Sequence, residues 1–180
     1  NAVRKHCSPI KGGQLARAAH PAEVVALMLS DVVGNPLDVI ASGPTVPDTT
    51  TFADAQSILY KYGIAGSVPE RIAHQLRQGT AGEAPETPKE GDPIFAGVQN
   101  EVIGSNAIAA QAALAQAEAL GFHALLLSTY VEGEAREVAK VVAAIAKSLS
   151  VEGWPCARPA CVSAGGETTV TLRGEGEGGG

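Results

Sequence analysis

The spacing of hydrophobic residues along the chain alternates between a helical period and short continuous apolar runs. Apolar side chains three or four residues apart predict amphipathic helices, whereas short apolar runs bounded by Gly, Pro and polar residues predict buried strands. We expect helices at 1–20 (broken at Gly12-Gly13), 52–63, 68–79, from about 106 to 120 and 134–149. We expect strands at 23–30, 102–103, 123–127, 160–163 and 168–173.

This alternation predicts the α/β class, with a mostly parallel sheet and right-handed crossovers. Gly121 follows the Ala-rich helix and is expected to end it in the left-handed conformation. Residues 80–97 are rich in Gly, Pro, Thr and charged residues, which indicates a surface excursion. A chain of 180 residues is long enough for one sizeable domain.

Composition narrows the classes of function. Aromatic residues make up 4% of the chain and the formal net charge is −6, which argues against a nucleic-acid-binding surface. No apolar run approaches the roughly 20 residues of a membrane span. Three cysteines do not indicate a disulfide framework. We therefore expect a cytoplasmic protein with no nucleic-acid or membrane partner.

The segment 30–45, SDVVGNPLDVIASGPT, is the most informative part of the sequence. It comes after a predicted strand, and ligands of open α/β sheets bind at the carboxyl ends of strands. Asp31 comes directly after that strand, so its carboxylate is a candidate for Mg²⁺ binding or for general-base catalysis. The alternative is a turn cap. Asp38 is expected to bond the backbone of its own loop.

Lys11-Gly12-Gly13 precedes a predicted helix and places an ammonium beside backbone N–H groups, as an anion site requires. A solvated lysine before a helix break explains the same pattern equally well. The preceding Arg4-Lys5-His6 is expected to lie on a solvated helix face.

Gly165-Gly166-Glu167-Thr168-Thr169 resembles a phosphate or metal loop between two strands. A hairpin turn followed by β-branched strand residues explains it at least as well, and on its own is the preferred interpretation. Ser105-Asn106 is by default a helix N-cap at a strand end.

Several common motifs are missing or have the wrong chemistry. Residues 174–179, GEGEGG, match G-x-G-x-x-G, but their two glutamates would repel a pyrophosphate. The sequence contains no P-loop and no G-x-S-x-G elbow, and Cys156 and Cys161 have no nearby histidine to complete a zinc site.

Taken in order, several motifs resemble one family, the glycerate 2-kinases of the MOFRL type. The segments that carry the resemblance cover essentially the whole chain: 1–16, 30–48, 86–89 (ETPK), 102–106 (VIGSN), 132–139 (EGEAREVA) and 165–180. Members of that family phosphorylate the 2-hydroxyl of D-glycerate with ATP and Mg²⁺, and some have been named hydroxypyruvate reductases.

The resemblance implies two unlike three-layer α/β/α domains around a cleft, and small-molecule partners, D-glycerate and ATP. A homodimer is compatible with it. It assigns Asp31 a metal-binding or base role, Lys11 neutralisation of phosphate or carboxylate, and Glu167 a metal or ribose contact. The remaining residues expected to bind substrate or nucleotide are Ser42, Gly43, Asn106, Gly165, Gly166 and Thr168.

The chain departs from the family pattern in ways that matter. It has Gly34-Asn35-Pro36 where Gly-Asp-Pro is usual, and Cys7 where Leu is usual. The SGGGSA-type loop that normally precedes this region is not in the sequence, nor is the Arg-Asn-Gln-Glu that normally comes after it. We therefore interpret residues 1–180 as the central part of an N-terminal α/β domain, with a link to a further domain beginning near 174–180, and expect no activity from it alone.

Two other functions are compatible with the sequence. One is an NAD(P)H-dependent reductase of hydroxypyruvate, against which the acidic GEGEGG segment argues. The other is a non-catalytic α/β domain that binds a ligand or a partner.

Overall fold

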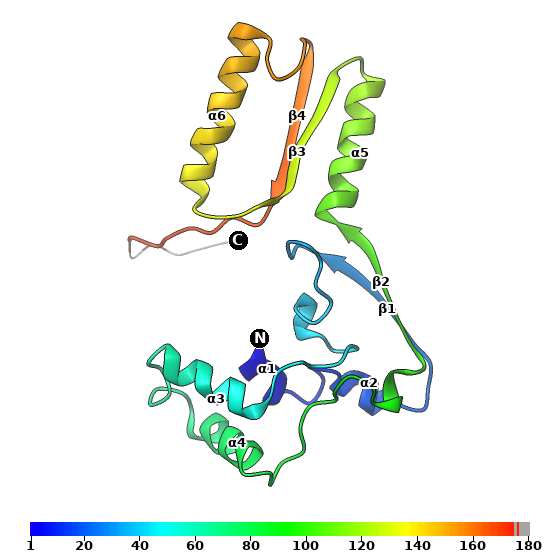
Figure 1. Ribbon diagram of the computed structural model, residues 1–180, viewed down its shortest axis with the longest axis vertical. Coiled ribbons are helices and arrows are strands. Elements are labelled where there is room, and N and C mark those ends of the chain that lie inside the picture. Colours follow the sequence, from blue (N-terminus) through cyan, green and yellow to red (C-terminus); the bar gives the residue numbers. More distant parts are fainter. Residues whose placement is uncertain (175, 177–180) are drawn as a thin grey trace. The chain divides into compact units, whose positions relative to one another are not determined.

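The structure is a computed structural model that describes residues 1–174 and 176, and it divides into two compact units. Unit 1 comprises residues 1–29 and 35–103, and unit 2 comprises residues 30–34 and the chain from residue 104 onward. Figure 1 shows helices and strands in both, so the α/β class is confirmed. The predicted link near 174–180 lies largely outside the described residues.

Unit 1 has a small helical core. Its helices are α1 (Ala2–His6), α2 (Gln14–Ala19), α3 (Phe52–Lys61) and α4 (Glu70–Thr80). They lie close to the predicted positions, except that residues 7–11, predicted to be helical, are not. The core consists of Ala2, Phe52, Ala55, Leu59 and Leu76, all buried. Thr51 begins α3 with a capping box, because its hydroxyl accepts from the Asp54 N–H while Asp54 accepts from the Thr51 N–H.

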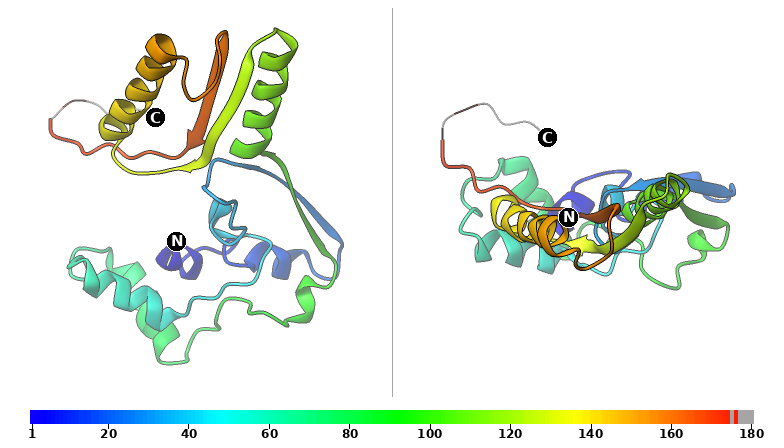
Figure 2. Two further views of the ribbon diagram at one scale, coloured as in Figure 1. Left: turned by 45° about the horizontal axis from the view of Figure 1, so that its top comes forward. Right: turned by 90° about the horizontal axis from the view of Figure 1, so that it is seen from above.

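Strands β1 (Val24–Ser30) and β2 (Val98–Ser105) pair with each other (Figure 2). The prediction of a strand at 23–30 is confirmed, but its burial is not, because alternate residues face solvent. Val25, Leu27 and Leu29 are 62%, 63% and 77% exposed. An apolar run therefore need not be buried on both faces, and periodicity alone could not show which face is covered.

The loop after β1 contains an unusual backbone segment. Ala41, Ser42 and Gly43 have φ values of 50°, 64° and 60°, so three consecutive residues are left-handed and two of them carry a Cβ. Such residues cost about 1 kcal/mol or more each, and the cost is tolerated only where the surroundings fix the conformation.

Residues 11–13 provide that fixation, because they donate hydrogen bonds to the carbonyls of the left-handed segment. The bonds are Lys11 Nζ to Ala41 O at 2.8 Å, Gly12 N to Ser42 O at 2.9 Å and Gly13 N to Gly43 O at 2.7 Å. Gly13 has φ 80°, and a Cβ there would lie 2.9 Å from the Phe95 ring. The N–H groups that were predicted to face an anion are thus engaged by the protein itself.

A buried polar network lies beside this loop, and it corrects the expectation of a solvated face on α1. The Lys5 and His6 side chains are 2% and 0% exposed. Lys5 Nζ lies 3.1 Å from Asp48 Oδ1 and 3.4 Å from Asp38 Oδ2. Asp38 therefore bonds a buried ammonium instead of the backbone of its own loop.

His6 extends the same network toward Glu86. Its Nδ1 is 2.8 Å from the Ala2 carbonyl oxygen and its Nε2 is 3.1 Å from Glu86 Oε2. Both partners are acceptors, so the two bonds form together only when each ring nitrogen carries a proton. Thr87 and Pro88, within the predicted surface excursion, are buried in this region.

Two carboxylates of the network have pKa values set by these contacts. Burial would raise the pKa of Asp48, but hydrogen bonds from Thr50, Lys5 and Thr87 outweigh it and lower that pKa below its usual value. Burial would also raise the pKa of Glu86. Hydrogen bonds from the Phe52 N–H, Lys89 and His6, and the charge of Lys89, outweigh burial and lower that pKa below its usual value.

Because both pKa values are lower in the fold than in the unfolded chain, their contribution to stability is present above the unfolded values, about 3.9 for Asp and 4.3 for Glu. It is lost as the pH falls toward the folded values. We predict that Asp48→Ala lowers the free energy of unfolding at pH 7 by about 3 kcal/mol, since it leaves the Lys5 ammonium buried with only Asp38.

Urea unfolding monitored by circular dichroism from pH 7 to pH 3 measures this effect. The wild type and Asp48→Ala are expected to converge at the acid end, whereas Glu90→Gln, at an exposed position, tracks the wild type throughout. Equal stability of Asp48→Ala and wild type at pH 7 would contradict the prediction.

Unit 2 is built on the parallel strand pair β3 (His123–Val131) and β4 (Ala160–Gly166). Helix α5 (Asn106–Ala119) precedes β3 and packs on both strands, and α6 (Ala135–Glu152) connects them. Figure 1 shows α5 and α6 on opposite sides of the pair. Parallel neighbours need such a crossover, which explains the helix between them. Gly121 is left-handed, with φ 83°, as predicted.

The predicted strand at 168–173 is wrong. Gly165-Gly166 ends β4 and is not a hairpin turn, and the residues after it make an isolated bridge between Thr169 and Glu134 in place of a strand. The Glu134 carboxylate accepts from the N–H and the hydroxyl of Thr171, which holds this segment against the start of α6.

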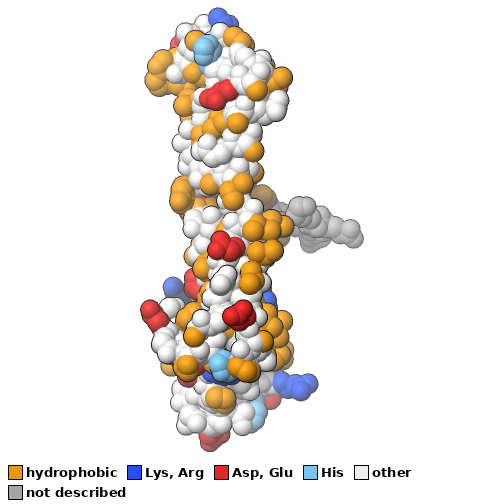
Figure 3. Space-filling model, turned by 90° about the vertical axis from the view of Figure 1, so that its right-hand side faces the viewer, with side chains coloured by type: hydrophobic (Ala, Val, Ile, Leu, Met, Phe, Trp, Pro, Cys, Tyr) orange, Lys and Arg blue, Asp and Glu red, His pale blue; other side chains and the backbone are white. Residues whose placement is uncertain are grey.

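Apolar side chains reach the surface at many points of the face in Figure 3, and Lys and Arg are scattered there instead of gathered. Among residues 1–174 and 176, no helix combines the length and hydropathy needed to cross a bilayer.

Candidate functional site

A polar hollow in unit 2 brings together five of the predicted site residues. It measures about 360 Å³ and lies where three segments of the unit meet: the end of β1, the start of α5 and the end of β4. Its walls are Ser30, Asp31, Ser105, Asn106, Ala109, Gly165, Gly166 and Glu167. We call it the strand-end hollow.

Asp31 is placed by the end of β1. Ser30 is 8% exposed, and its hydroxyl oxygen accepts from the Val32 N–H at 3.2 Å, which fixes the turn out of the strand. The Asp31 side chain is exposed, and no hydrogen bond to it occurs among the described residues. Ser30, not Asp31, therefore accounts for the turn, and the Asp31 carboxylate is left available to a ligand.

Asn106 comes from the junction of β2 with α5. Ser105 caps α5, since its hydroxyl oxygen accepts from the Ile108 N–H at 3.3 Å. The N-cap interpretation of the Ser105-Asn106 pair is thus confirmed for Ser105. Asn106 is the first residue of the helix, and its amide lines the hollow.

Gly165 and Gly166 are needed for close packing. A Cβ on Gly165 would fall 1.9 Å from Asn106 Oδ1, and one on Gly166 would fall 2.0 Å from the Val131 carbonyl oxygen. These two glycines therefore let the end of β4 approach the Asn106 amide and the end of β3.

Glu167 gives the hollow its second carboxylate. Its N–H donates to the Val131 carbonyl oxygen at 2.9 Å, and its side chain is exposed. Within the described part of the chain, no group of three or more His, Cys, Asp and Glu residues is arranged to hold a metal. Mg²⁺ is often held by one or two carboxylates with water and substrate phosphates, so Asp31 and Glu167 fit that ion.

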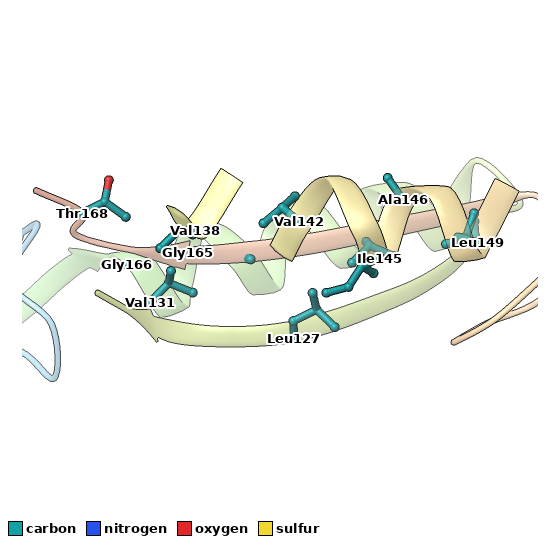
Figure 4. A pocket seen from close by; sticks show the side chains of 13 residues that line it. Leu127, Val131, Val138, Val142, Ile145, Ala146, Leu149, Gly165, Gly166 and Thr168 are labelled. Carbon is teal, nitrogen blue, oxygen red and sulfur yellow. The ribbon is translucent and has the colours of Figure 1, made fainter. Parts of the chain in front are cut away.

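Thr168 lines a neighbouring cavity instead. This cavity, of about 600 Å³, lies between α6 and the strand pair and shares Gly165 and Gly166 with the strand-end hollow (Figure 4). Its walls are otherwise aliphatic, including Leu127, Val142 and Ile145. The chemistry of the site therefore changes from polar to apolar across the two glycines.

The other three predicted site residues, Lys11, Ser42 and Gly43, lie in unit 1. Ser42 is 1% exposed and its hydroxyl donates to Asn1 Oδ1 at 3.1 Å, so it is engaged within the protein. Gly43 is buried, and a Cβ there would meet Val46 and the Asp38 backbone. Lys11 is partly exposed and bonds the Ala41 carbonyl.

Sequence reasoning missed Ser30 and Ala109 as lining residues and treated Ser105 only as a cap. Ser30 could have been found from its place at a strand end directly before Asp31. Ala109 lies one turn into α5, and the pattern of an Ala-rich helix gives no sign of which face is turned to a site.

Comparison with known proteins agrees with the pattern of motifs. Residues 1–77 match the family DUF4147, described as a domain of unknown function. The chain is 44% identical over 180 residues to the glycerate 2-kinase of Pyrococcus horikoshii. It also aligns with the crystal structure of the Thermotoga maritima glycerate kinase at a TM-score of 0.77 and 40% identity, over 99% of this chain. The chain is a homologue of the glycerate 2-kinases.

The resemblance stated from the motifs is thus confirmed. The chain spans 40% of the length of both relatives, so it corresponds to a part of each of them. Another relative, from Agrobacterium vitis, is 48% identical over 181 residues and bears the name of a hydroxypyruvate reductase.

The contact between Gly165 and Asn106 gives a direct test of the packing in the hollow. We predict that Gly165→Ala lowers the free energy of unfolding by about 1–3 kcal/mol, because the added methyl group displaces the Asn106 amide. Adding Asn106→Ala is expected to restore part of that loss, since it removes the atoms that clash.

Denaturant unfolding of the two single variants and the double variant measures the coupling. Gly66→Ala is a matched control, because nothing lies within 4 Å of a Cβ at that position. Strictly additive effects of Gly165→Ala and Asn106→Ala would show that the two residues do not touch.

Proposed function

We propose that this chain supplies part of the active site of an enzyme that transfers the γ-phosphoryl group of ATP to the 2-hydroxyl of D-glycerate. The observation that carries the proposal is the meeting of Asp31, Asn106 and Glu167 in one hollow, in a chain 44% identical to a glycerate 2-kinase. Phosphoryl transfer depends mainly on alignment and charge neutralisation, and two carboxylates beside an amide are suited to both.

In this proposal Glu167 and Asp31 hold Mg²⁺, which when bound would offset the negative charge of the phosphates. Asp31 is also placed to accept the proton of the acceptor hydroxyl, because its carboxylate is exposed in the hollow and not consumed by the turn. The Asn106 amide donates a hydrogen bond to the substrate or to a phosphate oxygen. Gly165 and Gly166 let a ligand approach the backbone closely.

Lys11 keeps its proposed role in neutralising a phosphate or carboxylate. One of its N–H groups is bonded to the Ala41 carbonyl, which leaves two donors on the partly exposed ammonium. Ser42 and Gly43 are proposed to act through the shape of the left-handed loop, since the Ser42 hydroxyl is engaged by Asn1.

We predict that Asp31→Asn lowers kcat for D-glycerate phosphorylation by at least a hundredfold in the longer polypeptide that carries this sequence, within the usual range for general acid–base catalysis. Glu167→Gln is expected to raise the Mg²⁺ concentration needed for half-maximal rate. Coupled ADP release with ATP and D-glycerate gives the rates, and phosphorus NMR gives the position of the phosphate on the product.

Glu118→Gln, on the exposed side of α5, is the matched control and is expected to leave kcat unchanged. Turnover by Asp31→Asn at the wild-type rate would contradict the proposal that the strand-end hollow is part of the active site. The 180-residue chain alone is expected to be inactive, because it spans 40% of the length of its relatives.

A hydroxypyruvate reductase is the second candidate, favoured by the name of the Agrobacterium vitis relative. Oxidation of NADH or NADPH by hydroxypyruvate, with no ADP released from ATP and D-glycerate, would favour the reductase over the kinase. Ligand binding without turnover in either assay would instead support a non-catalytic domain.

A further inference from the structure

A second polar cavity lies in unit 1, and none of the site residues assigned above lines it. It measures about 620 Å³, within the range of cavities that hold small molecules. His6 and Thr87 line it with side chains that are bonded within the buried network, to Glu86 and Asp48. Four further lining residues can donate hydrogen bonds from their side chains: Ser8, Gln14, Arg71 and Gln75. We call it the donor pocket.

The hydrogen bonds already made at the donor pocket leave the donor ends free. The Ser8 hydroxyl oxygen accepts from the Ile10 N–H at 3.4 Å, so its own proton is available. Gln14 Oε1 accepts from Arg17 Nη1 at 3.1 Å, which leaves the amide nitrogen of Gln14 as the free end. Both groups are therefore available as donors.

Arg71 and Gln75 are one helical turn apart on α4, so they share a face of that helix. Among residues 1–174 and 176, neither side chain has a hydrogen-bond or ion-pair partner. Arg77 on the same helix differs, because its guanidinium is paired with Glu70. The cation at the donor pocket is thus free of a carboxylate.

The wall of the donor pocket contains no Asp or Glu among the described residues, although the chain has a net charge of −6. Glu86, between two lining residues, is engaged by the His6 ring and the Phe52 N–H. Burial raises the pKa of the Cys7 thiol on the same wall, so that this group adds no negative charge. Unneutralised donors around one cavity favour an anion.

We propose that the donor pocket binds a small oxyanion, the phosphate or carboxylate group of a metabolite, through the Arg71 guanidinium and the side chains of Ser8, Gln14 and Gln75. The site is independent of the strand-end hollow and of the kinase proposal. The volume leaves room for an organic portion beyond the charged group.

Calorimetric titration with inorganic phosphate, D-glycerate and 2-phosphoglycerate tests the proposal, with side-chain amide NMR signals of Gln14 and Gln75 as a local readout. Arg71→Gln is expected to weaken binding about tenfold or more, because it removes a charge-assisted hydrogen bond. Tighter binding of the two phosphates than of D-glycerate would identify a phosphate site, and the reverse order a carboxylate site.

Arg77→Gln is the matched control, since it removes the same charge from the same helix outside the donor pocket. An equal loss of affinity in both variants, or no binding of any of the three anions, would overturn the proposal. Asp31→Asn is expected to leave this binding unchanged, so failure here and failure of the kinase proposal are separate outcomes.

Discussion

Unit 1 depends on the burial of one carboxylate. The Asp48 side chain is fully buried and accepts hydrogen bonds from Lys5, from the N–H and hydroxyl of Thr50, and from the Thr87 hydroxyl. A buried charge is costly unless it is paired and bonded, and these donors offset that cost. They come from α1, from the entry to α3 and from the 86–89 segment, and Asp48 therefore joins three stretches that are far apart in the sequence.

The candidate site in unit 2 depends on a different feature, the meeting of several strand ends. Asp31 comes after β1, Asn106 after β2 and Glu167 after β4, so each functional side chain is delivered by the residue next to a strand end. The two glycines at the end of β4 are what allow these ends to approach. The backbone at the strand ends forms the hollow, and the side chains of Asp31, Asn106 and Glu167 supply its polar groups.

Much of this could be predicted from the sequence, and the failures have physical causes. The helices, the strand positions and the place of Asp31 as a strand-end residue can be read from local spacing. The burial of Lys5 could not, because the carboxylate that compensates it is 43 residues away. The engagement of the Gly12 and Gly13 N–H groups was missed for the same reason, since their acceptors belong to the loop after β1. The strand expected at 168–173 failed because β-branched residues fit an extended segment whether or not a partner strand lies beside it.

The left-handed segment 41–43 has a consequence for how this sequence can vary. Its shape is maintained by hydrogen bonds from residues 11–13, so the two motifs form one mechanical element although they lie far apart in the sequence. A glycine at position 41 would relieve the strain of the left-handed backbone and keep the hydrogen bonds. A side chain on Gly13 would instead displace residues 11–13 and remove the hydrogen bonds that hold the loop. Tolerance to change therefore differs between positions of this element: position 41 accepts a glycine, whereas Gly13 accepts no side chain.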